Sequence, residues 1–440
     1  METSIDSDIG TLVVSRLTRR LVPFLFVLYI IAYLDRINVG FAALQMQEQL
    51  KFNNATYGLG SGMFFAGYLF FQVPSNLVLQ RLGARRWIAL IMISWGIVSS
   101  SMIFVNTPLS FYCLRFLLGV TEAGFFPGMI IYLKNWFPAA RQARTIARFM
   151  TAGALSGVVG GLVSPALLGV HAFRLAGWQW LFLGEGLPAV LLGAVVAVYL
   201  TDHPKDAHWL AEKDRNWLVE TLRVEKESHP AAAHTSIWTA FAEGNVWYCI
   251  LLLVIAYFGA NTFAYGISFF LPKVIKSVSV HSNSVIGLLS AIPYVAAAIA
   301  MTIAGGHSDR TGERRLHVAL PAFAGALAMG AAAYSTSLTV TMVALSIALM
   351  GVWSIYGPFW AIPSNMLTGT AAVLGVAVIN SLGNLGGLFG PWAIGRLSDK
   401  SGGYRGAFLL IGGALALTGF AALLLRVPRV RAVPRQIIQD

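Results

Sequence analysis

Charged residues are scarce in this chain. Of its 440 residues only 11% are Asp, Glu, Lys or Arg, whereas soluble domains carry about 25%. Hydrophobic residues make up 57%, which is more apolar sequence than a soluble core needs. A membrane can accommodate it, since about 20 apolar residues form one spanning helix. The composition excludes a soluble enzyme and a disordered scaffold, and it predicts an all-α membrane protein.

Cysteine and histidine are also rare. Cys113 and Cys249 both lie in apolar runs, which excludes a disulfide-stapled module and indicates small core residues. All 8 histidines fall in loops or at the ends of apolar stretches. An intramembrane enzyme would need a nucleophile with its base, or a metal cluster. We therefore expect no enzyme, no metal site and no cofactor.

Twelve apolar stretches have the length of a membrane span. They are residues 21–43, 57–78, 87–105, 109–134, 142–170, 177–200, 244–272, 283–305, 318–334, 339–364, 371–395 and 406–426. The one long, charged connection separates six spans from six. We predict an N-terminal six-helix bundle over 1–200, a cytoplasmic linker over 201–243 and a C-terminal six-helix bundle over 244–440.

The net charge of +12 has an uneven distribution along the chain. Most Lys and Arg residues lie in the N-terminus, the C-terminus and alternate connections between spans. A nucleic-acid surface gathers basic residues on one face or helix, so no nucleic-acid partner is expected. The positive-inside rule instead places both termini in the cytoplasm and predicts a multi-pass protein of the plasma (inner) membrane, with the lipid bilayer as its partner.

The central connection contains apolar residues at helical spacing. They are Trp209, Leu210, Trp217, Leu218 and Leu222. One interpretation is an amphipathic helix that lies on the cytoplasmic membrane surface. The other is a solvated linker helix that only tethers the two bundles.

The two halves of the chain repeat one another. Residues 160–162 of the fifth span, Gly-Gly-Leu, recur as residues 386–388 of the eleventh. The turn at 83–86 after the second span recurs at 312–315 after the eighth, at nearly the same offset. Parallel six-span repeats related by an axis along the membrane normal predict a substrate site between the halves.

Five charged residues fall inside predicted spans, and all belong to the first half. They are Asp35, Arg36, Arg115, Glu122 and Glu185. A charge at the bilayer centre costs about 2.5–3.5 kcal/mol on insertion scales, so such residues are functional candidates. Arg115 and Glu122 are two helical turns apart and share a face.

Two interpretations of this charged group remain open. In the first, Arg36 and Arg115 bind an anionic substrate, because a planar guanidinium suits a carboxylate, while Asp35 and Glu122 carry protons. In the second, Asp35–Arg115 and Arg36–Glu122, or the reverse pairing, are ion pairs that only close the bundle. Glu185, near the start of the sixth span, is expected to be structural.

Neutral polar residues on other spans are candidates for the opposite wall of a binding site. They are Tyr68, Asn261 and Tyr265 at i, i+4, and Asn380 and Asn384 at i, i+4. Each i, i+4 pair occupies one helix face. Hydrogen bonding to substrate is the functional interpretation, and hydrogen bonding between helices is the structural one.

The connection after the eighth span resembles the signature cytoplasmic loop of the major facilitator superfamily. Its matching residues are Gly305, Asp309, Arg310, Gly312, Arg314 and Arg315. The copy after the second span keeps Gly83 but has Asn76 and Gln80 where the usual Gly and Asp would stand. The resemblance implies two pseudo-symmetric six-helix bundles and a gating role for this loop.

More narrowly, the chain resembles the anion:cation symporter family, which transports tartrate, sugar acids and aromatic acids. The matching segments are 33–36, 74–77, 115–124 and 177–186. The resemblance implies that Asp35 and Glu122 couple protons and that Arg36 and Arg115 support coupling and anion binding. It also implies that Tyr68 and Asn384 touch the substrate.

The sequence therefore predicts a monomeric, proton-coupled symporter that imports a small organic anion by alternating access. A sugar acid, a tartrate-like hydroxy acid or an aromatic carboxylate would fit. The proton gradient would be the driving force. Alternatives are an antiporter or exporter of amphipathic compounds, a sodium-coupled anion carrier, and a substrate-sensing receptor.

Overall fold

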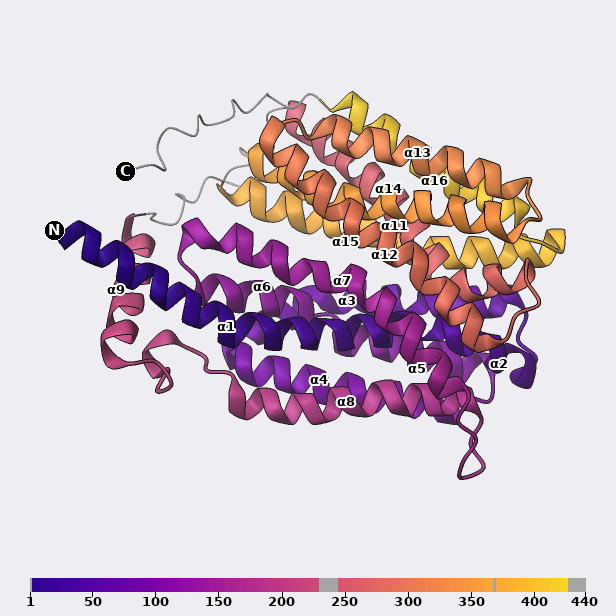
Figure 1. The fold of residues 1–440 in the computed structure, drawn as a ribbon, viewed down its shortest axis with the longest axis horizontal. Helices are drawn as coiled ribbons and strands as arrows, with labels where there is room; N and C mark the ends of the chain where they lie inside the picture. Colours follow the sequence, from indigo (N-terminus) through magenta and orange to yellow (C-terminus); the bar gives the residue numbers. More distant parts are fainter. Residues whose placement is uncertain (1, 229–243, 367–368, 426–440) are drawn as a thin grey trace. The chain divides into compact units, whose positions relative to one another are not determined.

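The computed structural model describes residues 2–228, 244–366 and 369–425, and these are almost entirely helical (Figure 1). Eleven helical segments among them are long and apolar enough to cross a membrane. The remaining predicted span, 371–395, falls within α15 (Gly369–Ser401). The far part of the predicted linker, residues 229–243, and the C-terminal residues 426–440 lie outside the described part of the chain.

Contacts between Cα atoms divide the chain into two compact units. The first unit contains the described residues up to Lys51 and from Met63 to Ser228. Its elements are α1 (Glu2–Ile37), α2 (Val39–Leu50), most of α3 (Asn54–Leu82), α4 (Ala84–Ser100), η1 (Ser101–Phe104), α5 (Pro108–Glu122), α6 (Phe125–Trp136), α7 (Ala139–Leu168), α8 (Gly177–Tyr199), η2 (Pro204–Asp206) and α9 (Glu212–Ser228).

The second unit contains Phe52–Gly62, which form the start of α3, and the described residues from Gly244 onward. Its further helices are α11 (Gly244–Ser277), α12 (Asn283–Thr311), α13 (Arg315–Ala333), α14 (Leu338–Met366), α15 and α16 (Arg405–Leu424). The long helices of each unit run alongside one another (Figure 1). The first turn of α3 is fixed by Asp399 of α15, whose carboxylate accepts from the backbone amides of Asn54 and Ala55.

The same pairs of spans pack together in both units. The first span of each half packs on the fifth, as α1 on α7 and α11 on α15, and the third packs on the sixth, as α4 on α8 and α13 on α16. This agreement follows from the sequence repeat, because equivalent helices present equivalent apolar faces. The fold is therefore the predicted all-α arrangement of pseudo-symmetric helix bundles.

Glycine brings several of these helices together backbone to backbone. A Cβ atom on Gly67 of α3 would lie 3.0 Å from the amide nitrogen of Val120 in α5. A Cβ atom on Gly119 of α5 would lie 2.9 Å from the amide nitrogen of Tyr68. Neither position has room for a side chain. The close approach of α3 and α5 carries the aromatic residues of α3 to the charged residues of α5.

The linker departs from the prediction at its start. Trp209 and Leu210 do not belong to the linker helix, because α9 begins only at Glu212, after the short helix η2 that Pro204 opens. Both residues still pack inward: the Trp209 ring stacks on Trp136, and Leu210 is buried. Within α9, Leu218 is buried and α9 packs on α1. The apolar residues of the linker thus contact the first unit.

Candidate functional site

A buried ion pair in the first unit joins Arg36 of α1 to Glu122, the last residue of α5. Arg36 Nη2 donates to Glu122 Oε1, and the exposed fractions of the two side chains are 11% and 1%. Each residue stands at an interruption of its span, since α1 gives way to α2 at Asn38 and α5 ends at Glu122. The structure thus contains one of the two ion pairs that the structural interpretation predicts.

Arg36 and Arg115, the two arginines inside predicted spans, both lie against Phe64 of α3. The Cζ atom of Arg36 is 5.0 Å from the centre of the Phe64 ring, and that of Arg115 is 5.4 Å from it. The ring of Tyr68 has its centre 5.7 Å from Arg36 Cζ. Cation–π attraction favours these positions. The structure therefore brings the predicted residues Arg36, Arg115 and Tyr68 together around one aromatic ring, which the sequence did not single out.

Asp35 is fully buried and accepts hydrogen bonds from neutral donors. Trp95 Nε1 and Ser99 Oγ, both on α4, lie 2.9 Å and 2.7 Å from its carboxylate oxygens. Asn38 Nδ2 lies 3.4 Å from Asp35 Oδ1. Sequence reasoning missed Trp95 and Ser99, because a single indole or hydroxyl on an apolar span is too common to mark a site.

Glu185, which the sequence indicates to be structural, lies close to Asp35 and Asn38. Its Oε1 accepts from Ser164 Oγ at 2.7 Å. Its Oε2 and the Oδ1 atom of Asn38 are both buried without a hydrogen-bond partner among the described residues, although the two side chains are close enough to interact. Asn38 therefore stands between the carboxyls of Asp35 and Glu185.

The second unit contains a network of amide and phenol groups between α11, α14 and α15. Asn261 Nδ2 donates to Asn384 Oδ1 at 3.3 Å and to the backbone oxygen of Gly383 at 3.2 Å. Tyr356 OH donates to Asn261 Oδ1 at 3.0 Å, and Asn384 Nδ2 donates to Asn380 Oδ1 at 3.2 Å. Three predicted residues, Asn261, Asn380 and Asn384, are thus connected.

Two aromatic residues lie in or next to this network. Tyr265, the fourth neutral polar residue predicted in this half of the chain, packs its ring against Phe269 with centroids 6.2 Å apart. Tyr356 belongs to the network, although an aromatic residue on a span usually serves only packing. Its contact with Asn261 shows that it belongs to the network, and this contact can be recognised only once α11 and α14 are packed together.

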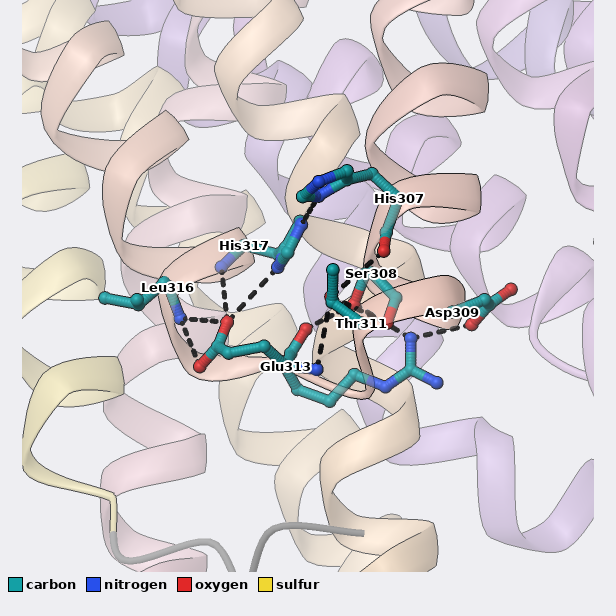
Figure 2. A network of polar contacts seen from close by, with 8 residues as sticks. His307, Ser308, Asp309, Thr311, Glu313, Leu316 and His317 are labelled. Carbon is teal, nitrogen blue, oxygen red and sulfur yellow. Dashed lines mark hydrogen bonds and ion pairs between the residues drawn. The ribbon is translucent and has the colours of Figure 1, made fainter. Parts of the chain in front are cut away.

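The signature loop of the second unit connects α12 to α13 (Figure 2). Gly312 ends α12 with a φ of 67°, a left-handed conformation that favours glycine. Arg314 Nη1 donates to Ser308 Oγ at 2.8 Å and to Asp309 Oδ1 at 2.7 Å. Arg310 is exposed, and a Cβ atom on Gly305 would meet nothing within 4 Å.

Glu313 fixes the start of α13 in the same loop. Its carboxylate accepts from the backbone amides of Leu316 and His317, at 2.8 Å and 3.3 Å (Figure 2). Burial raises the pKa of Glu313, but these bonds and that of the His317 ring outweigh burial and hold the pKa below its usual value. His317 Nε2 in turn lies 2.7 Å from His307 Nδ1.

The equivalent loop of the first unit obtains its carboxylate from another helix end. Gly83 has a φ of 82°, and Asp202, which follows α8, accepts from the Arg85 amide at 2.9 Å and pairs with Arg85 Nε at 3.3 Å. Asp202 thus provides an acidic partner in a loop that has Gln80 at the usual acidic position. Sequence spacing alone could not connect residues so far apart.

The fold and the buried polar groups define a membrane transport protein. The family model for the Major Facilitator Superfamily matches residues 25–367 and 277–439, so the chain belongs to this superfamily. It is a transporter of the plasma membrane and not an enzyme. Within the described residues, no three His, Cys, Asp or Glu side chains are grouped to hold a metal ion.

Several curated proteins are similar over nearly the whole chain. An Agrobacterium vitis protein named as a proposed tartrate transporter is 46% identical, over 96% of both chains. A Pseudomonas putida protein named as a proposed metabolite transport protein, NicT, is 42% identical, over 96% of this chain and 97% of its own. A quinolone resistance transporter of Acinetobacter baumannii is 37% identical, over 89% of each.

Solved transporter structures share the fold. The D-xylose-proton symporter superimposes with a TM-score of 0.74 at 14% identity, over 95% of this chain and 99% of its own. A bacterial homologue of the human lysosomal transporter Spinster gives a TM-score of 0.72 at 17% identity, over 91% and 96%. At such low identity the likeness concerns the fold alone.

Proposed function

We propose that this protein is a proton-coupled symporter of the anion:cation symporter family that imports a small organic anion by alternating access. The observation that carries the proposal is the buried Arg36–Glu122 ion pair beside the second buried guanidinium of Arg115. A buried pair contributes little net stability. Protonation of Glu122, however, would break the ion pair and leave the Arg36 guanidinium available to a carboxylate ligand.

Charge balance in the first unit favours one resident proton. Its interior holds three buried carboxyls and two guanidiniums, so neutrality requires one carboxyl to be protonated. Glu185 suits that role, because Ser164 donates to its Oε1 atom while its buried Oε2 atom has no hydrogen-bond partner among the described residues. A proton on Oε2 would be donated to Asn38 Oδ1 and would satisfy two buried atoms at once. Asp35, with its three donors, then remains ionised.

The same balance sets the order of events. A proton from outside neutralises Glu122 and releases Arg36, and the carboxylate of a monoanion takes the place of the Glu122 charge. A dianion such as a tartrate-like hydroxy acid requires a second proton, which Asp35 accepts. An anion without its protons would leave uncompensated charge in a low-dielectric interior, which is why anion and proton move together.

The neutral network of the second unit supports recognition of the rest of the substrate. Asn261, Asn384 and Tyr356 offer amide and hydroxyl groups that can donate to or accept from substrate hydroxyls. A buried polar group left without a partner costs about 1–3 kcal/mol. A hydroxy acid that replaces the present mutual bonds is therefore favoured over an apolar acid of the same size.

The proposal is tested by uptake of a carboxylate panel into proteoliposomes under an inward proton gradient. The panel contains tartrate, aldonic and uronic acids, nicotinate and a neutral sugar. We expect concentrative uptake of at least one carboxylate, abolished by a protonophore and unchanged when choline replaces sodium. Uptake that follows a sodium gradient would replace proton by sodium coupling. No carboxylate uptake under any gradient would disprove the proposal.

The relative from Acinetobacter baumannii favours one second candidate, the export of amphipathic compounds. An exporter would bind its substrate through apolar contacts and would tolerate loss of Arg36. The discriminating measurement is efflux of a fluoroquinolone from cells that express the wild type or Arg36→Ala. Efflux by both variants would favour the exporter, whereas loss of carboxylate uptake in Arg36→Ala alone favours the symporter.

A further inference from the structure

A basic cavity in the first unit lies apart from the buried ion pair. Its volume is about 420 Å³, and the residues that line it are Arg16, Arg19, Arg20, Trp209, Leu210 and Ala211. It is formed where the N-terminal part of α1 meets the segment between η2 and α9. The positive-inside pattern assigns this end of the unit to the cytoplasmic side. None of the lining residues belongs to the proposed transport site.

Arg20 is held rigidly at the edge of this cavity. Its Cζ atom is 4.7 Å from the centre of the Tyr199 ring and 4.6 Å from the Trp209 ring. Tyr199 OH also donates to the backbone oxygen of Arg20 at 3.1 Å, and the Trp209 ring is itself stacked on Trp136. A guanidinium fixed in this way loses little conformational entropy when it binds a ligand.

The positive charge at the cavity exceeds the negative charge that pairs with it. Asp214 is the acid that pairs with Arg16, and none of the described residues that line the cavity is acidic. The Nε atom of Arg20 is buried without a hydrogen-bond acceptor among the described residues. Phosphate oxygens are the acceptors that guanidinium groups bind most specifically.

An apolar groove adjoins the cavity at the same arginine. Its volume is about 570 Å³, and Arg20, Ala194, Val195, Val198 and Tyr199 line it. Val198 is 85% exposed and Val195 45% exposed, on a helix that spans the membrane. Such residues face the acyl chains of lipids. The basic cavity and the apolar groove therefore present two chemically different surfaces that meet at Arg20.

We infer that this composite surface is a binding site for an anionic phospholipid. The phosphate of the headgroup lies against Arg19 and Arg20, and an acyl chain follows α8 along Ala194 and Val198. A soluble phosphate compound shares the headgroup chemistry but has nothing to place in the groove. Basic pockets at the cytoplasmic interface, with aromatic side chains at headgroup depth, have the composition that anionic headgroups require.

The experiment is native mass spectrometry of the full chain in detergent, with added lipid at known concentration. Phosphatidylglycerol, cardiolipin and phosphatidylcholine are compared, and sn-glycerol 3-phosphate represents the free headgroup. We expect tight binding of the two anionic lipids alone. Arg20→Gln should weaken that binding at least about tenfold, because one charge-assisted bond is worth about 1.5–3 kcal/mol.

Two further variants separate the possible outcomes. Arg81→Gln removes the same charge from an exposed position of α3 outside the cavity and should leave lipid binding unchanged. Ala194→Trp fills the groove from an exposed position and should also weaken lipid binding. The inference is overturned if phosphatidylcholine binds equally well, if Arg81→Gln matches Arg20→Gln, or if glycerol phosphate binds as tightly as the lipids and Ala194→Trp has no effect.

Discussion

The two units share their pattern of helix pairing but differ in their polar interiors. The first unit buries Asp35, Arg115, Glu122 and Glu185 and partly buries Arg36. The second unit instead buries the neutral side chains of Asn261 and Asn384. A neutral amide network keeps its hydrogen bonds at any physiological pH, whereas a group of carboxyls and guanidiniums changes with the proton supply. Under the proposed function, the first unit serves energy coupling and the second serves substrate recognition.

The largest expected effect is the loss of coupling in Glu122→Gln. Glutamine keeps the shape and the hydrogen bond to Arg36 but cannot carry a transferable proton. We expect gradient-driven accumulation of the anion to fall to background, while exchange of labelled for unlabelled anion continues. Equal loss of accumulation and exchange, measured in the same proteoliposomes, would give Glu122 a structural role only.

Substitution of Glu185, the third buried carboxyl of the first unit, should have a different effect from substitution of Glu122. Glu185→Gln keeps a donor and an acceptor, so accumulation and its pH profile should stay close to wild type. Glu185→Leu leaves Ser164 and Asn38 without their partner and should reduce accumulation about tenfold or more. If Glu185→Gln instead abolished accumulation but not exchange, Glu185 would carry a transported proton and our assignment of a resident proton would be wrong.

Removing a side-chain amide from the second unit should impair binding of the anion more than its coupling to protons. Asn261→Ala breaks bonds to Asn384 and Tyr356, and it should raise the KM for the anion about tenfold. The proton-to-anion ratio, measured from the reversal potential in proteoliposomes, should not change. A changed ratio would mean that the second unit also takes part in coupling.

The two loop glycines offer a comparison of stability between the units. Gly83→Ala and Gly312→Ala both force a positive φ on alanine, which costs about 1–3 kcal/mol. Gly83→Ala should cost more, because its Cβ would lie 3.0 Å from Asp202 Oδ1. Gly305→Ala is the control, since its Cβ meets nothing within 4 Å. The order of thermal stabilities should be Gly305→Ala, then Gly312→Ala, then Gly83→Ala.

The smallest effect concerns Glu313, which caps α13 in the second unit. Its pKa is lowered in the folded protein, so its contribution to stability is present above the usual glutamate pKa and is lost as pH falls through the lowered value. Glu313→Gln should reduce stability by about 1 kcal/mol at pH 7 and by less near pH 4. A difference that stays constant with pH would show that the carboxylate charge has no part in the cap.

The sequence was most informative where a residue is costly to place. Charges in apolar spans singled out Asp35, Arg36, Arg115 and Glu122 as candidates, and the internal repeat predicted two pseudo-symmetric six-helix bundles. Residues that are common in spans were not identified: Phe64 beside the two arginines, and Trp95 and Ser99 on Asp35. Their significance depends on which helices meet, and that is decided by tertiary packing.

The start of the linker helix was predicted wrongly for a related physical reason. Trp209 fits helical spacing with Trp217, but Pro204 opens a separate short helix and the residues before Glu212 follow a turn. Periodicity records which side chains are apolar, not where the backbone changes direction. The ion pair between Asp202 and Arg85 could likewise not be predicted from a local motif, because the two residues are far apart in the sequence.

The ion pair between α1 and α5 also constrains how the protein is made. Asp35 and Arg36 enter the translocon in the first span to be synthesised, and each is costly to leave in lipid alone. The donors for Asp35 arrive with α4, and the carboxylate for Arg36 arrives only with the end of α5. The first span therefore reaches its lowest free energy only after the fourth has emerged from the ribosome. The polar partners of the first span are thus complete only when the helices of this half have packed together.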